Sequence, residues 1–210
     1  MHAEADVDAR DSSGDSALHR AKTPEKIRLL VAHGADVNAL AEPPRGSDGW
    51  ASTPLQSALL LSRLDGLDRV RTLLDLKADP KRRDGQDRST LCYYPMTEIF
   101  QLIIAHGLDP QERIPGGGTL LHNLFQTTSI RASKPDEIAF LDFLLGLGLP
   151  INVVDDTGQT MLHIAVARTE TTEDIALLLD RGADSKIHDG QGRRPIDLVP
   201  KSLKTLRAIL

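Results

Sequence analysis

A short apolar motif returns six times along this chain, and this recurrence constrains the fold more than any other feature. The copies are Ser16-Ala17-Leu18-His19, Thr53-Pro54-Leu55-Gln56, Ser89-Thr90-Leu91-Cys92, Thr119-Leu120-Leu121-His122, Thr160-Met161-Leu162-His163 and Arg194-Pro195-Ile196-Asp197. Their third residues are 37, 36, 30, 41 and 34 positions apart. Self-similarity at a period of ~20 to 50 residues is the mark of stacked repeats. The sequence therefore predicts units that bury their core against their neighbours and present one long surface.

The closing half of each unit supports the same period. The segment from Leu29 to Asn38 ends in Gly-Ala-Asp-Val-Asn, and the segment from Leu177 to Asp184 repeats its pattern. A glycine just past a helix is expected because the chain there enters the left-handed region, which penalises a Cβ. One unit has Lys77 at this position, at an expected cost of about 1 kcal/mol. We interpret Lys77 as a tolerated weak joint.

These motifs and their spacing resemble those of ankyrin repeats over nearly the whole chain. The match is strong for 155–186, good for 11–38 and weak for 89–123. The resemblance implies an all-α solenoid of stacked helix-turn-helix pairs with hairpin fingers, formed by residues 1–210 as a single domain. The units expected are 11–39, 40–82, 83–112, 113–153, 154–186 and a C-terminal capping unit 187–210.

The units are uneven in length. The short distances from Leu18 to Leu29 and from Leu91 to Leu102 predict first helices of about one turn. Thr23-Pro24 and the segment 94–97 are expected to start the second helices of these units. Insertions at 40–47 and 129–135 lengthen two others, and insertions in such arrays often lie on the binding side. In the last unit, an apolar face of Leu203, Leu206, Ile209 and Leu210 opposes a polar face of Lys204, Thr205 and Arg207.

The resemblance also implies a partner surface, because ankyrin proteins generally bind other proteins through finger tips and first-helix faces. The matching tip residues are Ser12, Ser13, Gly49, Trp50, Gly85, Gln86, Asp156, Thr157, Gly190 and Gln191. The first-helix candidates are Arg20, Lys22, Gln126 and Arg168, and His188 lies in a finger beside Asp189. Trp50 is the only tryptophan, the residue most enriched in interface hot spots. The alternative for Trp50 is that it folds back over the base of its own long finger.

Residues that could carry chemistry have structural explanations instead. His19, His122 and His163 fall one per repeat, where the resemblance implies hydrogen bonds between fingers and the separation is too large for a shared metal. His33 and His106 precede helix-ending glycines and should contact carbonyls there. The glycine-rich segment 115–119 lacks the lysine of a phosphate loop, and Asp155-Asp156 lacks the spacing of a calcium loop. Catalytic motifs are absent from the sequence, so we expect no enzyme, no cofactor and no metal site.

Composition narrows the partners. A formal net charge of −5 argues against nucleic acid. No apolar run approaches the ~18 residues of a membrane span, and the single Cys92 excludes an internal disulfide. The first residues have neither the charge nor the apolar stretch of a signal peptide, which favours the cytoplasm. Because the chain begins within a repeat-like segment, a removed upstream signal, and with it a periplasmic location, stays an alternative.

The function expected is therefore non-catalytic binding of one specific partner protein by a chain that is monomeric when unbound. The sharper hypothesis is an inhibitor, such as an immunity protein against a cognate bacterial toxin. It rests on small size, acidic balance and a composition typical of a GC-rich bacterial genome, with arginine outnumbering lysine 17 to 8. The alternative is a scaffold or adaptor that bridges two partners.

Overall fold

The computed structural model describes residues 6–44, 51–60, 66–93, 97–127, 135–168, 171–201 and 203–210. The chain forms two compact units, residues 1–109 and 110–210, which are described separately below as unit 1 and unit 2. Within the described residues, regular structure is helical apart from two isolated antiparallel bridges, Arg10 with Ser16 and Val154 with Thr160.

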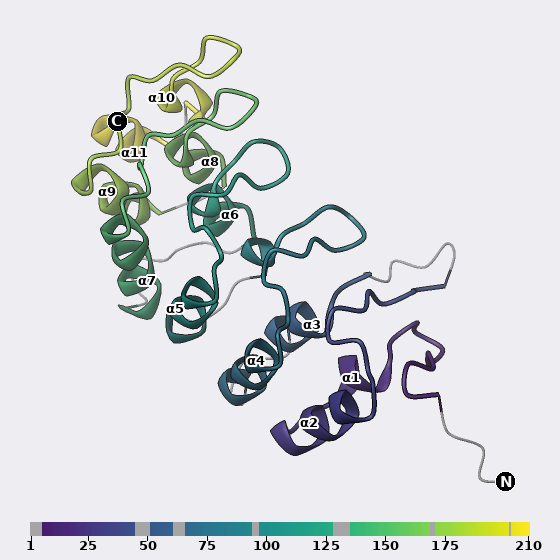
Figure 1. The fold of residues 1–210 in the computed structure, drawn as a ribbon. Helices are drawn as coiled ribbons and strands as arrows, with labels where there is room; N and C mark the ends of the chain where they lie inside the picture. The colour runs from purple at the N-terminus through teal and green to yellow at the C-terminus, as the bar shows by residue number, and fades with distance from the viewer. Residues whose placement is uncertain are drawn as a thin grey trace, which may run out of the picture. The chain divides into compact units, whose positions relative to one another are not determined.

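Unit 1 consists of helix pairs joined by projecting loops, which we call fingers (Figure 1). Its elements are α1 (Ala17–Arg20), α2 (Pro24–Ala32), α3 (Pro54–Leu60), α4 (Gly66–Asp75), the 3-10 turn η1 (Thr90–Cys92) and α5 (Thr97–Ala105). Helix α1 packs on α2 and α3, and α4 packs on α2, α3 and α5. The first helices α1 and α3 thus lie beside the fingers, with the second helices behind them (Figure 1).

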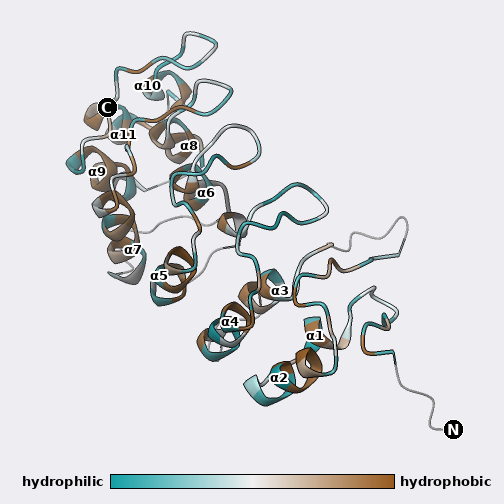
Figure 2. Cartoon of the chain, viewed as in Figure 1, coloured by the Kyte–Doolittle hydropathy of each residue, from teal (hydrophilic) through white to brown (hydrophobic). Residues whose placement is uncertain are grey.

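Unit 2 repeats this plan (Figure 1). Its elements are α6 (Leu120–Thr127), α7 (Pro135–Gly146), α8 (Met161–Arg168), α9 (Thr172–Asp180), α10 (Pro195–Leu198) and α11 (Lys204–Ile209). Helix α8 contacts α6, α9 and α10, and α11 contacts α9. In each unit the fingers are mainly hydrophilic and the helices carry most of the hydrophobic residues (Figure 2).

The motif leucines are the centre of each core. Leu18, Leu55, Leu91, Leu121 and Leu162 are all at most 2% exposed. Each is the second residue of a first helix, or of η1 in the third repeat, so a neighbouring first helix or second helix can cover it. The short first elements expected in the first and third repeats are confirmed, since α1 has four residues and η1 has three.

Local signals also place the helix ends as expected. The Thr23 hydroxyl caps α2 by accepting the Lys26 amide, with Pro24 at the first helical position. His33 and His106 bond the carbonyls of Leu29 and Leu102 through Nδ1, both at 2.8 Å, which confirms their predicted role. Lys77 has a φ of +72°, in the left-handed region, as its place in the repeat predicts.

The prediction for the last helix is wrong in part. Leu206 is buried, but Leu203 and Ile209 are each 38% exposed, so they do not form one buried face. Arg207 was assigned to the polar outer side, yet its guanidinium donates to the carbonyls of Ile196 and Val199 at 2.9 Å. Leu203 is the N-cap residue, with a ψ of +67°, so it lies outside α11 and does not share the helical spacing of Leu206 and Ile209.

Candidate partner-binding surface

Each Asp-initiated finger is a tight turn closed by its own first carboxylate. The Oδ1 atom of Asp11 accepts hydrogen bonds from the amides of Ser13 and Asp15. The Asp11 amide donates to the Asp15 carbonyl at 2.9 Å. The fingers that begin at Asp84, Asp155 and Asp189 repeat this arrangement, with Oδ1 accepting the amides two and four residues later. The first aspartate and main-chain atoms therefore hold each turn. Two tip side chains add to this, since the Thr157 hydroxyl donates to Asp155 at 2.7 Å and Oε1 of Gln86 accepts Nη2 of Arg88 at 3.1 Å.

Neighbouring fingers within a unit are joined by main-chain hydrogen bonds. In unit 1 the Glu42 amide donates to the Gly14 carbonyl at 2.8 Å. In unit 2 the Asp156 amide donates to Gly116 at 3.0 Å, and the Gly190 amide to Thr157 at 2.8 Å. This close approach requires glycine at Gly14, because an added Cβ would stand 1.9 Å from the Glu42 carbonyl oxygen.

The motif histidines join the helices to the next finger. Nδ1 of His19 lies 2.8 Å from the Ser16 hydroxyl, and Nε2 lies 3.0 Å from the Ser52 carbonyl. His122 bonds Thr119 and the Gln159 carbonyl in the same way, and His163 bonds Thr160 and the Arg193 carbonyl. The structural role expected for these residues is confirmed. Burial lowers the pKa of His19 and of His122, although the bond of each Nε2 to a carbonyl acts in the raising direction.

Gln56 shows what this position requires. Its Oε1 accepts the Thr53 amide at 2.8 Å and its Nε2 donates to the Arg82 carbonyl at 3.0 Å. A glutamine thus replaces both bonds of the histidine in the second copy of the motif. The position needs an acceptor for its own helix start and a donor for the next finger, and it does not need an imidazole.

Arginines neutralise several finger carboxylates. Nε of Arg20 lies 3.2 Å from Asp11 and 2.9 Å from Asp15, so this predicted partner residue also ties a finger to α1. The Arg193 guanidinium binds Asp189 in the same finger, at 2.9 Å from Nε. Burial acts to raise the pKa of Asp189, but hydrogen bonds from the Arg193 amide, the Arg193 guanidinium and the Gln191 amide lower it to about 2.

All the described partner candidates are exposed. In unit 1 these are Ser12, Ser13, Arg20, Lys22, Gly85 and Gln86. In unit 2 they are Asp156, Thr157, Arg168, His188, Gly190 and Gln191. Gly49 and Trp50 lie outside the described residues, and so does the side chain of Gln126. The amides of Gly85 and Gly190 are already donated to the preceding fingers, so these two glycines hold fingers together. Partner contact by all of these residues stays a prediction.

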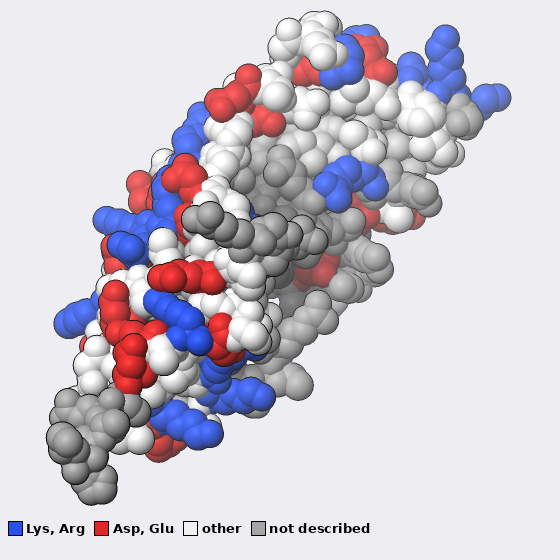
Figure 3. Space-filling view, turned by 90° about the vertical axis from the view of Figure 1, so that its right-hand side faces the viewer, with Lys and Arg blue, Asp and Glu red and all other residues white. Residues whose placement is uncertain are grey.

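Basic and acidic side chains are interspersed on the face that carries the fingers (Figure 3). Among the described residues, no group of three or more His, Cys, Asp and Glu side chains is placed to hold a metal ion. No helix among the described residues is long and apolar enough to cross a membrane.

The sequence did not predict the contacts of four side chains. Asn38 donates to the Lys77 carbonyl and accepts the Asp79 amide, and Asn152 bonds Gly182 and Asp184 in the same way. Asn38 is two residues after Asp36, and Asn152 stands at the corresponding position of a later repeat. This recurrence of Asn was the available signal. The Tyr93 hydroxyl donates to buried Asp84 at 2.7 Å, and Nη1 of Arg113 donates to the Val154 carbonyl at 2.7 Å. No sequence signal pointed to these last two.

Comparisons with known proteins agree with this geometry. No protein-family model matches the chain. Ankyrin repeat and SOCS box protein 6 of Homo sapiens is 31% identical over 94 residues, which cover 42% of this chain and 21% of that protein. The chain thus spans about a fifth of the length of this relative.

Solved structures share the fold over almost the whole chain. The ankyrin repeat domain of human ASB11 aligns with a TM-score of 0.72 at 22% identity, covering 98% of this chain and 87% of that one. An ankyrin repeat domain from Acinetobacter baumannii AYE aligns with a TM-score of 0.63 at 21% identity, covering 91% of this chain and 94% of that one.

Proposed function

Because the chain has the all-α fold of an ankyrin-repeat domain, we propose that it is a non-catalytic module that binds one specific partner protein. The observation that carries the proposal is that the groups which hold each finger differ from most of the side chains that it exposes. Main-chain hydrogen bonds, the first aspartate of each turn and the buried motif histidines fix the fingers, while the tip side chains Ser12, Gln86, Thr157 and Gln191 are exposed. A fixed backbone that presents exposed side chains loses little entropy on binding.

The finer proposal is an inhibitor that binds its target with 1:1 stoichiometry, as an immunity protein does with a bacterial toxin. Support comes from the formal charge of −5 and from the structural similarity to a bacterial ankyrin domain. Partner binding by the finger tips, rather than by the second helices behind them, is part of the same proposal.

The test is capture of partners from the source cells with the tagged chain, followed by mass spectrometry and measurement of the mass of the purified complex. Gln86→Arg places a bulky charge on a finger tip, and Gln101→Arg makes the same change on the exposed side of α5. We expect one stoichiometric partner that is lost with Gln86→Arg and kept with Gln101→Arg. Two partners bound at once would favour a scaffold, and no stoichiometric partner would contradict the proposed function.

A further inference from the structure

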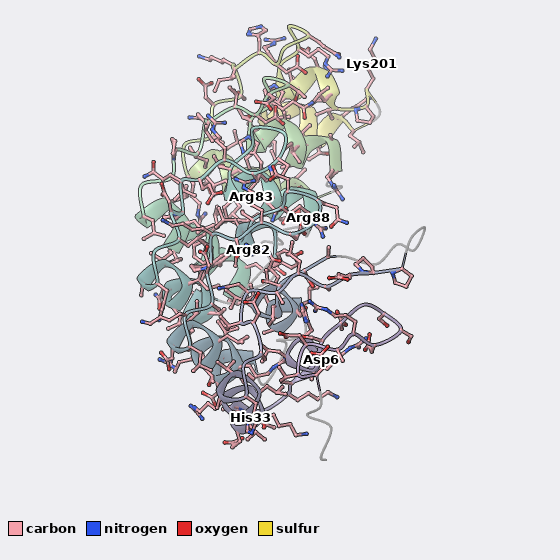
Figure 4. All side chains as sticks on the ribbon, turned by 45° about the vertical axis from the view of Figure 1, so that its right-hand side comes forward. Asp6, His33, Arg82, Arg83, Arg88 and Lys201 are labelled. Atoms are coloured by element: carbon pink, nitrogen blue, oxygen red, sulfur yellow. The ribbon has the colours of Figure 1, made fainter. Side chains whose placement is uncertain are left out.

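The finger that starts the third repeat differs in charge from the rest of the chain. Although the formal net charge is −5, residues 77–88 contain five Lys and Arg against three Asp. Lys81, Arg82 and Arg83 follow one another where the chain enters this finger. Figure 4 labels Arg82, Arg83 and Arg88, which lie near one another at the base of the finger. We call Lys81, Arg82 and Arg83 the basic segment.

The corresponding positions of the other repeats do not carry this charge. They hold Asn38-Ala39-Leu40, Gln111-Glu112-Arg113, Asn152-Val153-Val154 and Lys186-Ile187-His188. The central residue among these is neutral or acidic, and Ala39 is buried, whereas Arg82 is exposed. The fold therefore does not require three consecutive cations at this point.

The cations of this finger are divided between internal and external use. Arg88 is internal, because its Nε lies 2.6 Å from Asp84 and its guanidinium lies 5.5 Å from the centre of the Tyr93 ring. Arg83 is partly internal, because its Nη1 donates to the Asp87 carbonyl at 2.8 Å and lies 3.5 Å from the Asp87 carboxylate. Lys81 and Arg82 are exposed, and neither is ion-paired with any residue that the structure describes.

The backbone of the basic segment is already ordered. The Lys81 amide donates to the Asp79 carboxylate at 2.8 Å, and the Arg82 amide donates to the Asp79 carbonyl at 3.2 Å. The Arg82 carbonyl accepts Nε2 of Gln56 at 3.0 Å. A ligand that binds here therefore has to order only side chains, which reduces the entropy cost of association.

We infer that the basic segment is a docking surface for an acidic segment of the partner protein. The inference rests on the proposed function and specifies the chemistry of one contact. Two carboxylates in an extended peptide match the exposed Lys81 and Arg82 in charge and number, and the charge of Arg83 adds to the positive potential beside them. A continuous polyanion such as nucleic acid matches less well, because Asp79, Asp84 and Asp87 interrupt the basic residues and the whole chain is acidic.

The test on the full chain uses hexaglutamate as the probe at low ionic strength, followed by amide chemical shifts. We expect saturable shifts centred on 81–83, and about tenfold weaker binding by the Lys81→Ala/Arg82→Ala variant. The matched control is Lys26→Ala/Arg28→Ala, which removes two exposed cations from α2 of the same unit and should leave binding unchanged. Thermal melting of both variants verifies that they fold. Absent shifts, or equal losses in the two variants, would overturn the inference.

Two further measurements separate the alternatives. A 12-nucleotide oligothymidine that binds the same residues more tightly than hexaglutamate would assign the surface to nucleic acid and overturn the inference. With the partner captured as described above, Lys81→Ala/Arg82→Ala should weaken the complex and Lys26→Ala/Arg28→Ala should not. A partner that binds both variants equally would leave the proposed function intact and refute the docking surface. Absence of any partner would refute the proposed function, and the peptide titration would still decide the docking surface.

Discussion

At the scale of single residues, three residues have conformations or surroundings that cost free energy. Lys77 and Asp87 are the non-glycine residues with positive φ among those the structure describes, at +72° and +59°. Arg69 is only 6% exposed, and its Nε has no hydrogen-bond partner. Each of these positions is one where another residue would be more stable, so each gives a direct test.

Lys77→Gly should stabilise the protein by about 1 kcal/mol, because glycine adopts the left-handed conformation without a Cβ clash. Urea denaturation measures the effect. Lys81→Gly is the control, since Lys81 has no positive φ and the change should be neutral or destabilising. Equal effects of the two substitutions would mean that the strain at Lys77 is relieved elsewhere.

Arg69→Met should also stabilise, by about 1 kcal/mol or more, because it removes a buried guanidinium whose Nε is unpartnered. Burial lowers the pKa of Arg69, which is the sign expected when the charged form is disfavoured. Arg71→Met makes the same change two residues further along α4, at an exposed position, and should have little effect. A loss of stability in Arg69→Met alone would show that the guanidinium has a stabilising role.

The sequence predicts a residue's contacts well when its partners are close to it along the chain, and poorly when folding brings the partners from distant segments. Thr23, His33 and Lys77 were assigned correctly because capping and helix termination involve residues within one turn. Asp87, Tyr93 and Arg113 were not. Asp87 has a left-handed φ where the other Asp-initiated fingers have Gly14, Gly158 and Gly192, and the side chains of Tyr93 and Arg113 bond groups brought near by folding. Arg207 was misassigned for the same reason, because its partners are carbonyls of the preceding helix region.

At the scale of elements, two glycines allow the cost of finger-to-finger packing to be measured separately from the cost of a positive φ. Gly158 and Gly182 both have positive φ, at +76° and +89°. A Cβ on Gly158 would stand 2.5 Å from the Gly190 nitrogen, whereas a Cβ on Gly182 would meet nothing within 4 Å. The two glycines therefore differ in finger-to-finger contact and share the backbone requirement.

Gly182→Ala should cost about 1 kcal/mol, the conformational penalty alone. Gly158→Ala should cost more, because it also has to separate two fingers that are joined by the bond from Gly190 to Thr157. Chemical denaturation of both variants gives the comparison. Equal costs would contradict the view that close backbone approach, rather than φ alone, selects glycine at the finger tip.

The histidine bonds predict a pH dependence. Because burial lowers the folded-state pKa of His19 and His122, the unfolded state binds more protons between the folded pKa values and the unperturbed value of about 6.5. Stability should therefore rise as the pH is raised through this window and level off above it. The contribution is lost on acidification until the pH falls below the folded pKa values.

His19→Gln/His122→Gln should fold and lose this part of the pH dependence, since Gln56 makes both equivalent bonds in the native protein. Free energies of unfolding at a series of pH values between ~5 and ~8 measure the difference in slope, and carboxylate titration is common to both proteins. An unchanged slope in the variant would assign the pH dependence to other groups.

At the scale of the whole molecule, the exposed apolar side chains are dispersed. The large ones among the described residues are Leu29 on α2, Leu60 on α3, Val154 in a finger, and Leu203 and Ile209 at the two ends of α11. Apolar residues that are scattered singly do not form the patch that self-association requires. The chain on its own should therefore sediment as a monomer, and sedimentation velocity over a hundredfold range of concentration tests this.

Leu203→Asp/Ile209→Asp is the informative variant in that experiment. Leu203 is the N-cap of α11 and Ile209 is its last residue, so both lie where the predicted capping face is incomplete. If the native chain sediments as a monomer, the variant should not change its sedimentation coefficient. A concentration-dependent dimer that the variant abolishes would contradict the monomer and place its interface on α11.

The hydrogen bonds between neighbouring fingers have a consequence for how such a surface can change over generations. They join main-chain atoms, at Gly14 and Glu42 or at Thr157 and Gly190, so they do not depend on which side chains occupy the tips. Point mutations at Ser12, Gln86 or Gln191 can therefore alter what is recognised while the scaffold stays folded. Selection for a new target can act on these positions one at a time, without passing through unstable intermediates.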